Sequence, residues 1–131
     1  MIRLTSLCLF LYWLAIFAGT HLPSKALPNL HWSDKVLHAV AFSGLSFLIA
    51  WALPTRRSKW LQHIAVTVAI ALSYAILDEL TQTFIPGRSC DKWDLVADSA
   101  GITLGLITYW LLRGSLLQLS WGRKMIQTLA R

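Results

Sequence analysis

The chain has 131 residues, of which 56% are hydrophobic and only 14% are charged, and its formal net charge is +6. The length allows one domain, residues 1–131, and the composition is typical of integral membrane proteins rather than soluble ones. No basic patch with interleaved aromatic residues lies on a soluble element, so the positive charge favours membrane lipids with anionic headgroups over nucleic acid as partners.

Four apolar runs follow one another along the chain, each close to the roughly 20 residues that cross a hydrocarbon core. They cover about residues 4–20, 34–53, 61–84 and 93–113. The first is predicted to be a retained helix rather than a signal peptide, because no clean small-residue cleavage site follows it. Pro54 ends the second run and Pro86–Gly87 turns the chain after the third. The sequence predicts an all-α bundle of four transmembrane helices.

The segments between and after these runs have their own signals. Residues 20–33 contain Pro23 and Pro28 and predict an extended loop, with Ser33 as the N-cap of a helix that starts at Asp34. Residues 115–131 leave two interpretations open. They form a short, basic amphipathic helix on the membrane surface, or a frayed tail, because Gly122 weakens a helix.

The charged residues are divided unevenly between the two ends of the predicted bundle. One end receives eight basic residues and no acid: Arg3, Arg56, Arg57, Lys59, Arg113, Arg123, Lys124 and Arg131. The other receives four basic residues, Lys25, Lys35, Arg88 and Lys92, and all six acids, Asp34, Asp78, Glu79, Asp91, Asp94 and Asp98. Short loops rich in Lys and Arg stay in the cytoplasm, so both termini are expected there and the acids in the outer half.

Helix rise predicts that ionisable groups from three helices meet at one depth. His38, Asp78 and Asp98 each lie about 22–24 Å above the inner boundary of a roughly 30 Å core. Spacings of three or four residues put Asp34 with His38, and Asp78 and Glu79 with Gln82, on shared helix faces. Because ionisable side chains inside a membrane usually face a bundle interior or a wet cavity, a shared polar pocket is expected.

The last apolar run carries a stripe that is acidic at one end and small at the other. Asp94, Asp98, Gly101 and Gly105 follow at steps of four, three and four. The two glycines allow a neighbouring helix to approach closely. The acidic half of the stripe is then expected to open toward the outer leaflet.

Each polar residue of this pocket has an expected role. Glu79, His38 and Asp98 are the candidate catalytic acids and bases. Arg88 is expected to bind a phosphate or carboxylate of the ligand, with further ligand contacts from Asp34, Asp78, Gln82 and Asp94. The structural alternatives are that Asp34 and Asp94 merely cap helices, and that Asp78 or Glu79 pairs with Arg88, Lys35 or Lys92.

No cofactor is required by the sequence, but a divalent metal fits the same residues. Asp34, His38, Glu79 and Asp98 offer the oxygen and imidazole ligands that Mg²⁺, Mn²⁺ or Zn²⁺ use, although no compact motif such as HExxH is present. The remaining histidines, His21, His31 and His63, are interpreted as ordinary interfacial residues.

Three motifs resemble the VanZ-like membrane protein family over nearly the whole chain. They are Asp34–Lys35–x–x–His38, then Asp78–Glu79–x–x–Gln82–x–x–x–Pro86–Gly87–Arg88, then Asp94–x–x–x–Asp98–x–x–Gly101. The family pattern more often has Asn where this chain has Asp98. The resemblance implies a multi-pass protein of the bacterial inner membrane and a link to low-level resistance against teicoplanin, a lipoglycopeptide. It supplies no reaction.

Three functions remain open from the sequence. The favoured one is a site that binds or acts on a lipid-linked envelope component, or on a lipoglycopeptide, from the outer leaflet. The alternatives are a small ion- or proton-coupled transporter, and a structural adaptor within an envelope complex. The acids gather at one end and none lies in the inner half to complete a path, which argues against the transporter. The sequence leaves the oligomeric state undetermined.

Overall fold

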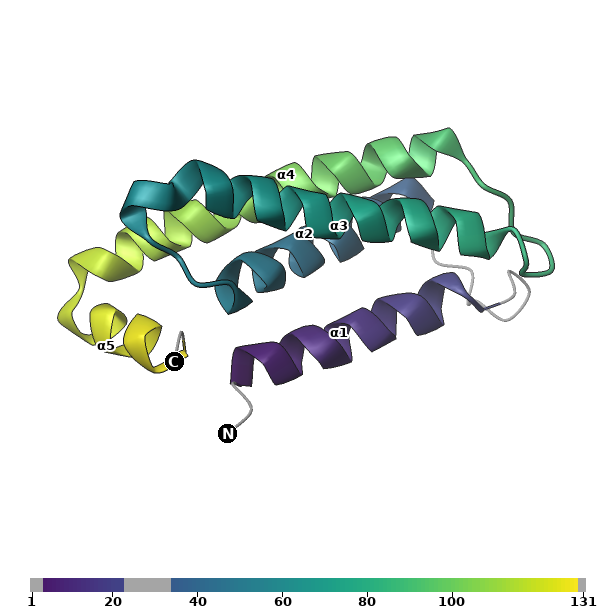
Figure 1. Cartoon of the computed structure of the whole chain (residues 1–131). Helices are drawn as coiled ribbons and strands as arrows, with labels where there is room; N and C mark the ends of the chain where they lie inside the picture. The colour runs from purple at the N-terminus through teal and green to yellow at the C-terminus, as the bar shows by residue number, and fades with distance from the viewer. Residues whose placement is uncertain (1–3, 23–33, 130–131) are drawn as a thin grey trace.

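The computed structural model describes residues 4–22 and 34–129, which form helices joined by short turns. The elements are α1 (Leu4–Thr20), α2 (Asp34–Ala52), the 3₁₀ turn η2 (Arg57–Lys59), α3 (Trp60–Gln82), α4 (Lys92–Gln118) and α5 (Ser120–Leu129). The first four α-helices run alternately up and down, and α5 turns back beside the end of α4 (Figure 1). The predicted loop with Pro23 and Pro28, its cap Ser33 and the interfacial His31 lie outside the described residues.

The described helices match a multi-pass membrane protein. Of these helices, α2, α3 and α4 are long and apolar enough to cross a membrane, and α1 is a shorter apolar helix. The 17 residues of α1 extend about 26 Å at 1.5 Å per residue, close to the thickness of a hydrocarbon core. Large apolar side chains such as Leu11, Leu77 and Leu111 point outward, as lipid-facing residues do. The predicted all-α bundle is confirmed.

The tightest contact of the bundle joins α2 to α4. A Cβ atom at Gly101 would overlap the carbonyl oxygen of Ala39, and one at Gly105 would overlap that of Ser43. Ser46 Oγ also donates to the carbonyl of Ile102 on α4, at 3.1 Å. The two backbones therefore touch directly along the glycine stripe that the sequence predicts.

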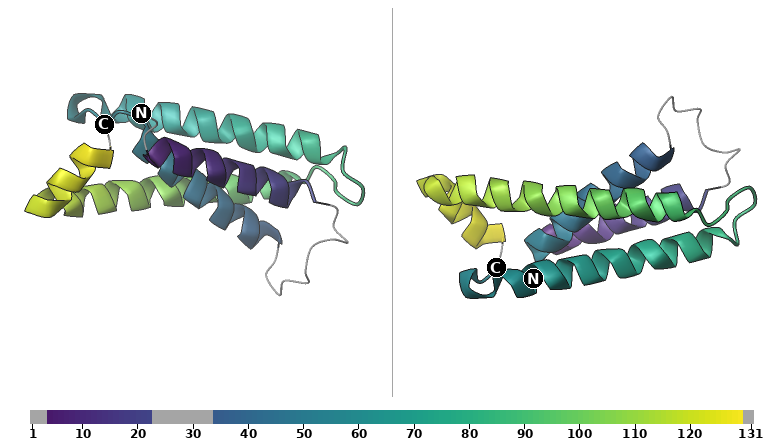
Figure 2. Two further views of the ribbon diagram at one scale, coloured as in Figure 1. Left: turned by 90° about the horizontal axis from the view of Figure 1, so that it is seen from below. Right: turned by 90° about the horizontal axis from the view of Figure 1, so that it is seen from above.

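Helix α1 packs mainly against α2, which crosses the bundle obliquely (Figure 2). The Tyr12 hydroxyl lies over Gly44 and donates to the carbonyl of Ala41 at 3.1 Å. At the end of α1, Thr20 Oγ1 donates to Asp78 Oδ1 on α3 at 2.8 Å. Hydrogen bonds of α1 to two neighbouring helices thus hold it in place.

The chain after α3 and α4 differs in detail from the sequence prediction. Helix α3 ends at Gln82, and the chain then turns through Pro86–Gly87. Gly87 has a φ of 81°, a conformation that favours glycine. Helix α4 does not stop near Arg113 but continues to Gln118, because a single glycine such as Gly114 costs a helix only about 1 kcal/mol. The segment that follows is helical, so of the two interpretations of the tail the helix is correct from Ser120 to Leu129.

At the end of the bundle opposite the acids, His63 is buried rather than interfacial as predicted. Its Nε2 lies 2.9 Å from the carbonyl oxygen of Ala50 and 3.1 Å from Thr55 Oγ1. Its ring stacks on Tyr109 with centroids 5.4 Å apart. Interhelical packing of aromatic rings, which depth along a helix does not predict, covers this histidine.

Candidate functional site

The acidic end of the bundle is formed by the start of α2, the end of α3 and the start of α4. It holds all six carboxylates of the sequence, and four of them are buried, Asp78, Glu79, Asp94 and Asp98. The opposite end, with the η2 turn and α5, is called the basic end here.

The central contact of the acidic end joins His38 on α2 to Asp98 on α4. His38 Nδ1 lies 2.9 Å from Asp98 Oδ1, the distance of an imidazole N–H that donates to a carboxylate. Asp98 is fully buried and His38 is 4% exposed. Gly101 lies one helical turn from Asp98 and lets α2 approach, which brings these two side chains together. The structure thus unites two of the three candidate catalytic residues.

Glu79 is the third candidate catalytic residue. It lies on α3 and is held by a short hydrogen-bond network. Gln82 Nε2 donates to Asp78 Oδ2 at 2.9 Å and lies 3.4 Å from Glu79 Oε1. The other oxygen of Glu79 accepts the backbone N–H of Asp91 at 3.0 Å. The amide of Gln82 therefore links the two adjacent acids of α3 and fixes their orientation.

Asp78 points away from His38, although the two residues are predicted to lie at the same depth. It accepts hydrogen bonds from Thr20 and Gln82, and its Oδ1 is 3.8 Å from His21 Nδ1. His21 in turn lies 2.9 Å from Thr81 Oγ1. Asp78 thus faces α1 rather than His38. Thr20 and His21 were missed as partners, and no spacing signal in the sequence points to them.

Ion pairs at the mouth of the site differ from the alternatives the sequence left open. Lys35 Nζ donates to Asp91 at 2.8 Å and to Asp94 at 3.0 Å. Arg88 Nη1 is 3.6 Å from Asp34 Oδ1. Neither Asp78 nor Glu79 forms a salt bridge with a described lysine or arginine, so the pairing predicted for them as structural partners is wrong.

The residue that caps α4 is also not one of those that the sequence suggested as caps. Asp91 is the N-cap of α4, since its side chain accepts from the backbone N–H of Trp93 at 2.9 Å. Asp94 is a buried residue of the first turn and is not the cap. The hydrogen bond from Lys35 holds the pKa of the exposed Asp91 carboxyl below its ordinary value.

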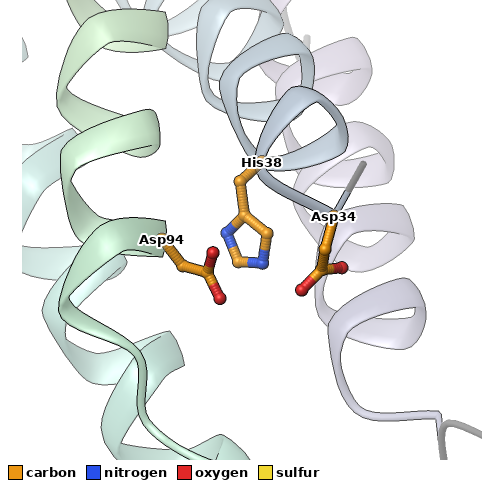
Figure 3. Close-up of side chains that lie close together, drawn as sticks. All are labelled: Asp34, His38 and Asp94. Carbon is orange, nitrogen blue, oxygen red and sulfur yellow. The ribbon is translucent and has the colours of Figure 1, made fainter. Parts of the chain in front are cut away.

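Two overlapping groups of metal-ligand type meet at His38. One comprises Asp34, His38 and Asp94, and the other His38, Glu79 and Asp98; within each group, one ligand atom per residue lies within 4.8 Å of the others. Figure 3 shows the imidazole of His38 between the carboxylates of Asp34 and Asp94. All four predicted metal-ligand candidates are therefore within these two groups.

Two cavities of the described residues meet beside this cluster. A groove of about 410 Å³ between α1 and α2 is lined by apolar side chains such as Ile16, Val40 and Phe42, with Asp34, His38 and Arg88 also in its wall. A polar cavity of about 310 Å³ is lined by Asp34, Gln82, Gly87, Arg88, Ser89, Asp91 and Asp94. Asp34 and Arg88 border both, so an apolar cavity adjoins a polar one at this point.

The arrangement supports three kinds of chemistry. Arg88 can bind an anion, because it lines both cavities and its guanidinium offers several N–H donors. The His38–Asp98 pair can exchange a proton with a ligand. The carboxylates around His38 can bind a cation.

Comparison with known proteins finds one family. A family model described as VanZ/LLP1 matches residues 4–113, from the start of α1 into α4. No curated protein and no solved structure matches the chain.

Proposed function

The chain belongs to the VanZ/LLP1 family, and from that premise we propose that it binds a lipid-linked component of the bacterial envelope by a phosphate or carboxylate in the headgroup. The observation that carries this proposal is the groove between α1 and α2, which is apolar along its length and has Arg88 in its wall. A cavity of that kind suits an amphiphile, whose chain needs apolar contact and whose headgroup needs fixed charges.

Three features of the groove support a ligand that arrives from the lipid phase. Leu37 and Val40 in its wall are 39% and 60% exposed, so the groove opens on the lipid-facing side of the described bundle. Arg88 lines both the groove and the polar cavity and so brings a guanidinium to the point where they adjoin. The adjoining polar cavity has room for a headgroup. The groove therefore provides for both parts of such a ligand.

In the proposed orientation the acidic end faces outward and both termini lie in the cytoplasm, because the eight basic residues of the other end stay inside. The protein then resides in the bacterial inner membrane, and the site meets headgroups in the outer leaflet. A proton-coupled transporter is less well supported, because the sequence places no carboxylate at the basic end to continue a path.

Native mass spectrometry with a polyprenyl phosphate tests the proposal on purified protein. Arg88→Met is expected to weaken binding at least about tenfold, the effect of about 1.4 kcal/mol of lost interaction. Arg56→Met, at an exposed arginine of the basic end, is the matched control and should bind as the wild type does. The corresponding polyprenol, which lacks the phosphate, should bind the wild type and Arg88→Met equally.

Equal binding of the polyprenyl phosphate to the wild type and Arg88→Met would overturn the proposal. Teicoplanin is added as a competitor in a second series. Displacement of the polyprenyl phosphate by teicoplanin would show that the groove also accepts a lipoglycopeptide, and a lack of displacement would restrict it to the lipid.

A further inference from the structure

Negative charge in the interior of the acidic end exceeds what the described lysines and arginines can neutralise. Of the four buried carboxylates, Asp94 alone pairs with a described lysine or arginine, Lys35. Glu79 accepts hydrogen bonds from an amide side chain and a backbone N–H, and Asp98 from an imidazole. A buried charge without a counter-charge is costly, so these two carboxylates require a proton or a cation.

One carboxylate oxygen there has no partner at all. Asp98 Oδ2 is buried and accepts no hydrogen bond from the described residues, while Oδ1 faces His38 Nδ1. Ligand atoms of His38, Glu79 and Asp98, from α2, α3 and α4, lie within 4.8 Å of one another, and all three residues are buried. We propose that His38, Glu79 and Asp98 bind a divalent metal cation.

The inner group is a better cation site than the outer group of Asp34, His38 and Asp94. Asp94 already bonds to Lys35 at 3.0 Å, and Asp34 is 3.6 Å from Arg88. A divalent cation beside these carboxylates would compete with two fixed positive charges. Glu79 and Asp98 have no such competitors among the described residues, so the cation supplies the charge that the inner group lacks.

The outer carboxylates then have a supporting role. With the cation on the Nδ1 side of the imidazole, where Asp98 lies, the proton of His38 resides on Nε2. Figure 3 shows Nε2 on the side of the ring that faces Asp34, whose carboxylate can accept that N–H. A histidine that binds a metal with one nitrogen and donates to a carboxylate with the other is held in one tautomer and orientation. Asp34 is therefore a positioning residue, and the carboxylate of Asp94 is held by Lys35.

The ligand set defines the kind of cation. One imidazole and two carboxylates suit Mn²⁺ or Zn²⁺, and three protein ligands leave coordination positions for water or another oxygen donor. If the proposed function also holds, a phosphate oxygen of the ligand is such a donor. The cation would then explain how an acidic cluster tolerates an anionic headgroup beside it. The metal site itself requires no lipid.

Metal binding is measured on full-length protein in detergent, without added lipid, after treatment with EDTA. Titration with Mn²⁺, followed by electron paramagnetic resonance, should give one site per chain, with a nitrogen coupling from an imidazole. Glu79→Gln and Asp98→Asn should each weaken binding at least tenfold, and His38→Gln should abolish the nitrogen coupling. Arg88→Met leaves all three ligands in place and removes a positive charge, so it should not weaken Mn²⁺ binding.

A wild-type protein that binds neither Mn²⁺ nor Zn²⁺ at 1:1 stoichiometry would overturn the inference, as would wild-type affinity in both carboxylate variants. Thermal melting of each variant, with and without Mn²⁺, accompanies the titration. If one carboxylate variant fails to fold, the imidazole coupling still decides, because only binding at the proposed site loses that coupling in His38→Gln. Loss of lipid binding in Arg88→Met with normal Mn²⁺ binding separates this site from the proposed function.

Discussion

His38 and His63 are both buried, at opposite ends of the same bundle, and their hydrogen-bond partners differ in charge. His63 meets the neutral Ala50 carbonyl, the Thr55 hydroxyl and the Tyr109 ring. His38 meets Asp98, with Asp34, Asp94 and Glu79 close by. Neutral partners bind only Nε2 of His63, whose buried Nδ1 has no partner among the described residues, yet they are enough to hold helices together. Around His38 the carboxylates outnumber the lysines and arginines that pair with them, which leaves negative charge to bind a ligand. Burial of a histidine therefore does not by itself distinguish a functional site from a packed core.

The largest expected effect comes from replacing each histidine by leucine. His38→Leu leaves Asp98 buried without its partner, which costs about 3–5 kcal/mol when the pair is charged. His63→Leu leaves only the Ala50 carbonyl and the Thr55 hydroxyl without that partner, a cost of about 1–3 kcal/mol. The free energies of unfolding are measured by SDS titration in mixed micelles. Equal losses would mean that His38 and Asp98 form a neutral pair, and the contrast between the two ends would disappear.

A smaller effect is expected at the glycine that brings His38 and Asp98 together. Gly101→Leu forces α2 away from α4, because its Cβ would overlap the Ala39 carbonyl, and this overpacking costs about 1–3 kcal/mol. Gly114→Leu, in the same helix but facing open space, is the control and should be neutral or slightly stabilising. The same SDS titration measures both. A wild-type stability in Gly101→Leu would contradict the direct backbone contact.

The smallest effect is expected at the exposed ion pair between Lys35 and Asp91. Neither His38 nor His63 takes part in this pair. Lys35 holds the pKa of Asp91 in the folded protein below the pKa in the unfolded chain. The pair therefore stabilises the fold at pH values above the unfolded-state pKa, and this stabilisation is lost as the pH falls through the folded-state pKa. Asp91→Asn keeps a good N-cap for α4 but removes the charge.

The melting temperatures of wild-type protein and Asp91→Asn should therefore differ slightly at pH 7, and the difference should be smaller at pH 3. A difference as large at pH 3 as at pH 7 would show that Asp91 acts through its capping geometry rather than its charge. Lys35→Met, compared at the same two pH values, checks that the partner is the one seen here.

Helical periodicity was sufficient to predict the bundle and part of the site. The spacing of Asp98 and Gly101 placed an acid beside a close helix contact, and the depth of His38 matched it; the structure joins the two at 2.9 Å. The same depth argument grouped Asp78 with them, but Asp78 turns toward Thr20 on α1. Helix rise gives the height of a residue and not the direction in which it points, so contacts across the bundle required the structure.

Interhelical packing also explains the remaining differences. The groove beside Tyr12 depends on how α1 leans on α2, and no local signal encodes that angle. Arg113–Gly114 predicts a helix end, yet α4 continues through Gly114 to Gln118 because one glycine is only a weak helix breaker. His63 looked interfacial because it follows a basic loop, whereas neighbouring aromatic rings enclose it.

The separation of acids and bases along the bundle also gives the protein a response to membrane voltage. In a cell whose interior is electrically negative, the proposed orientation puts the end with eight basic residues and no acid on the negative side. Each elementary charge moved across the full field is worth about 2.3 kcal/mol per 100 mV. An energised membrane therefore reinforces the topology that the loops specify, and an ionophore present during biosynthesis should increase the inverted fraction.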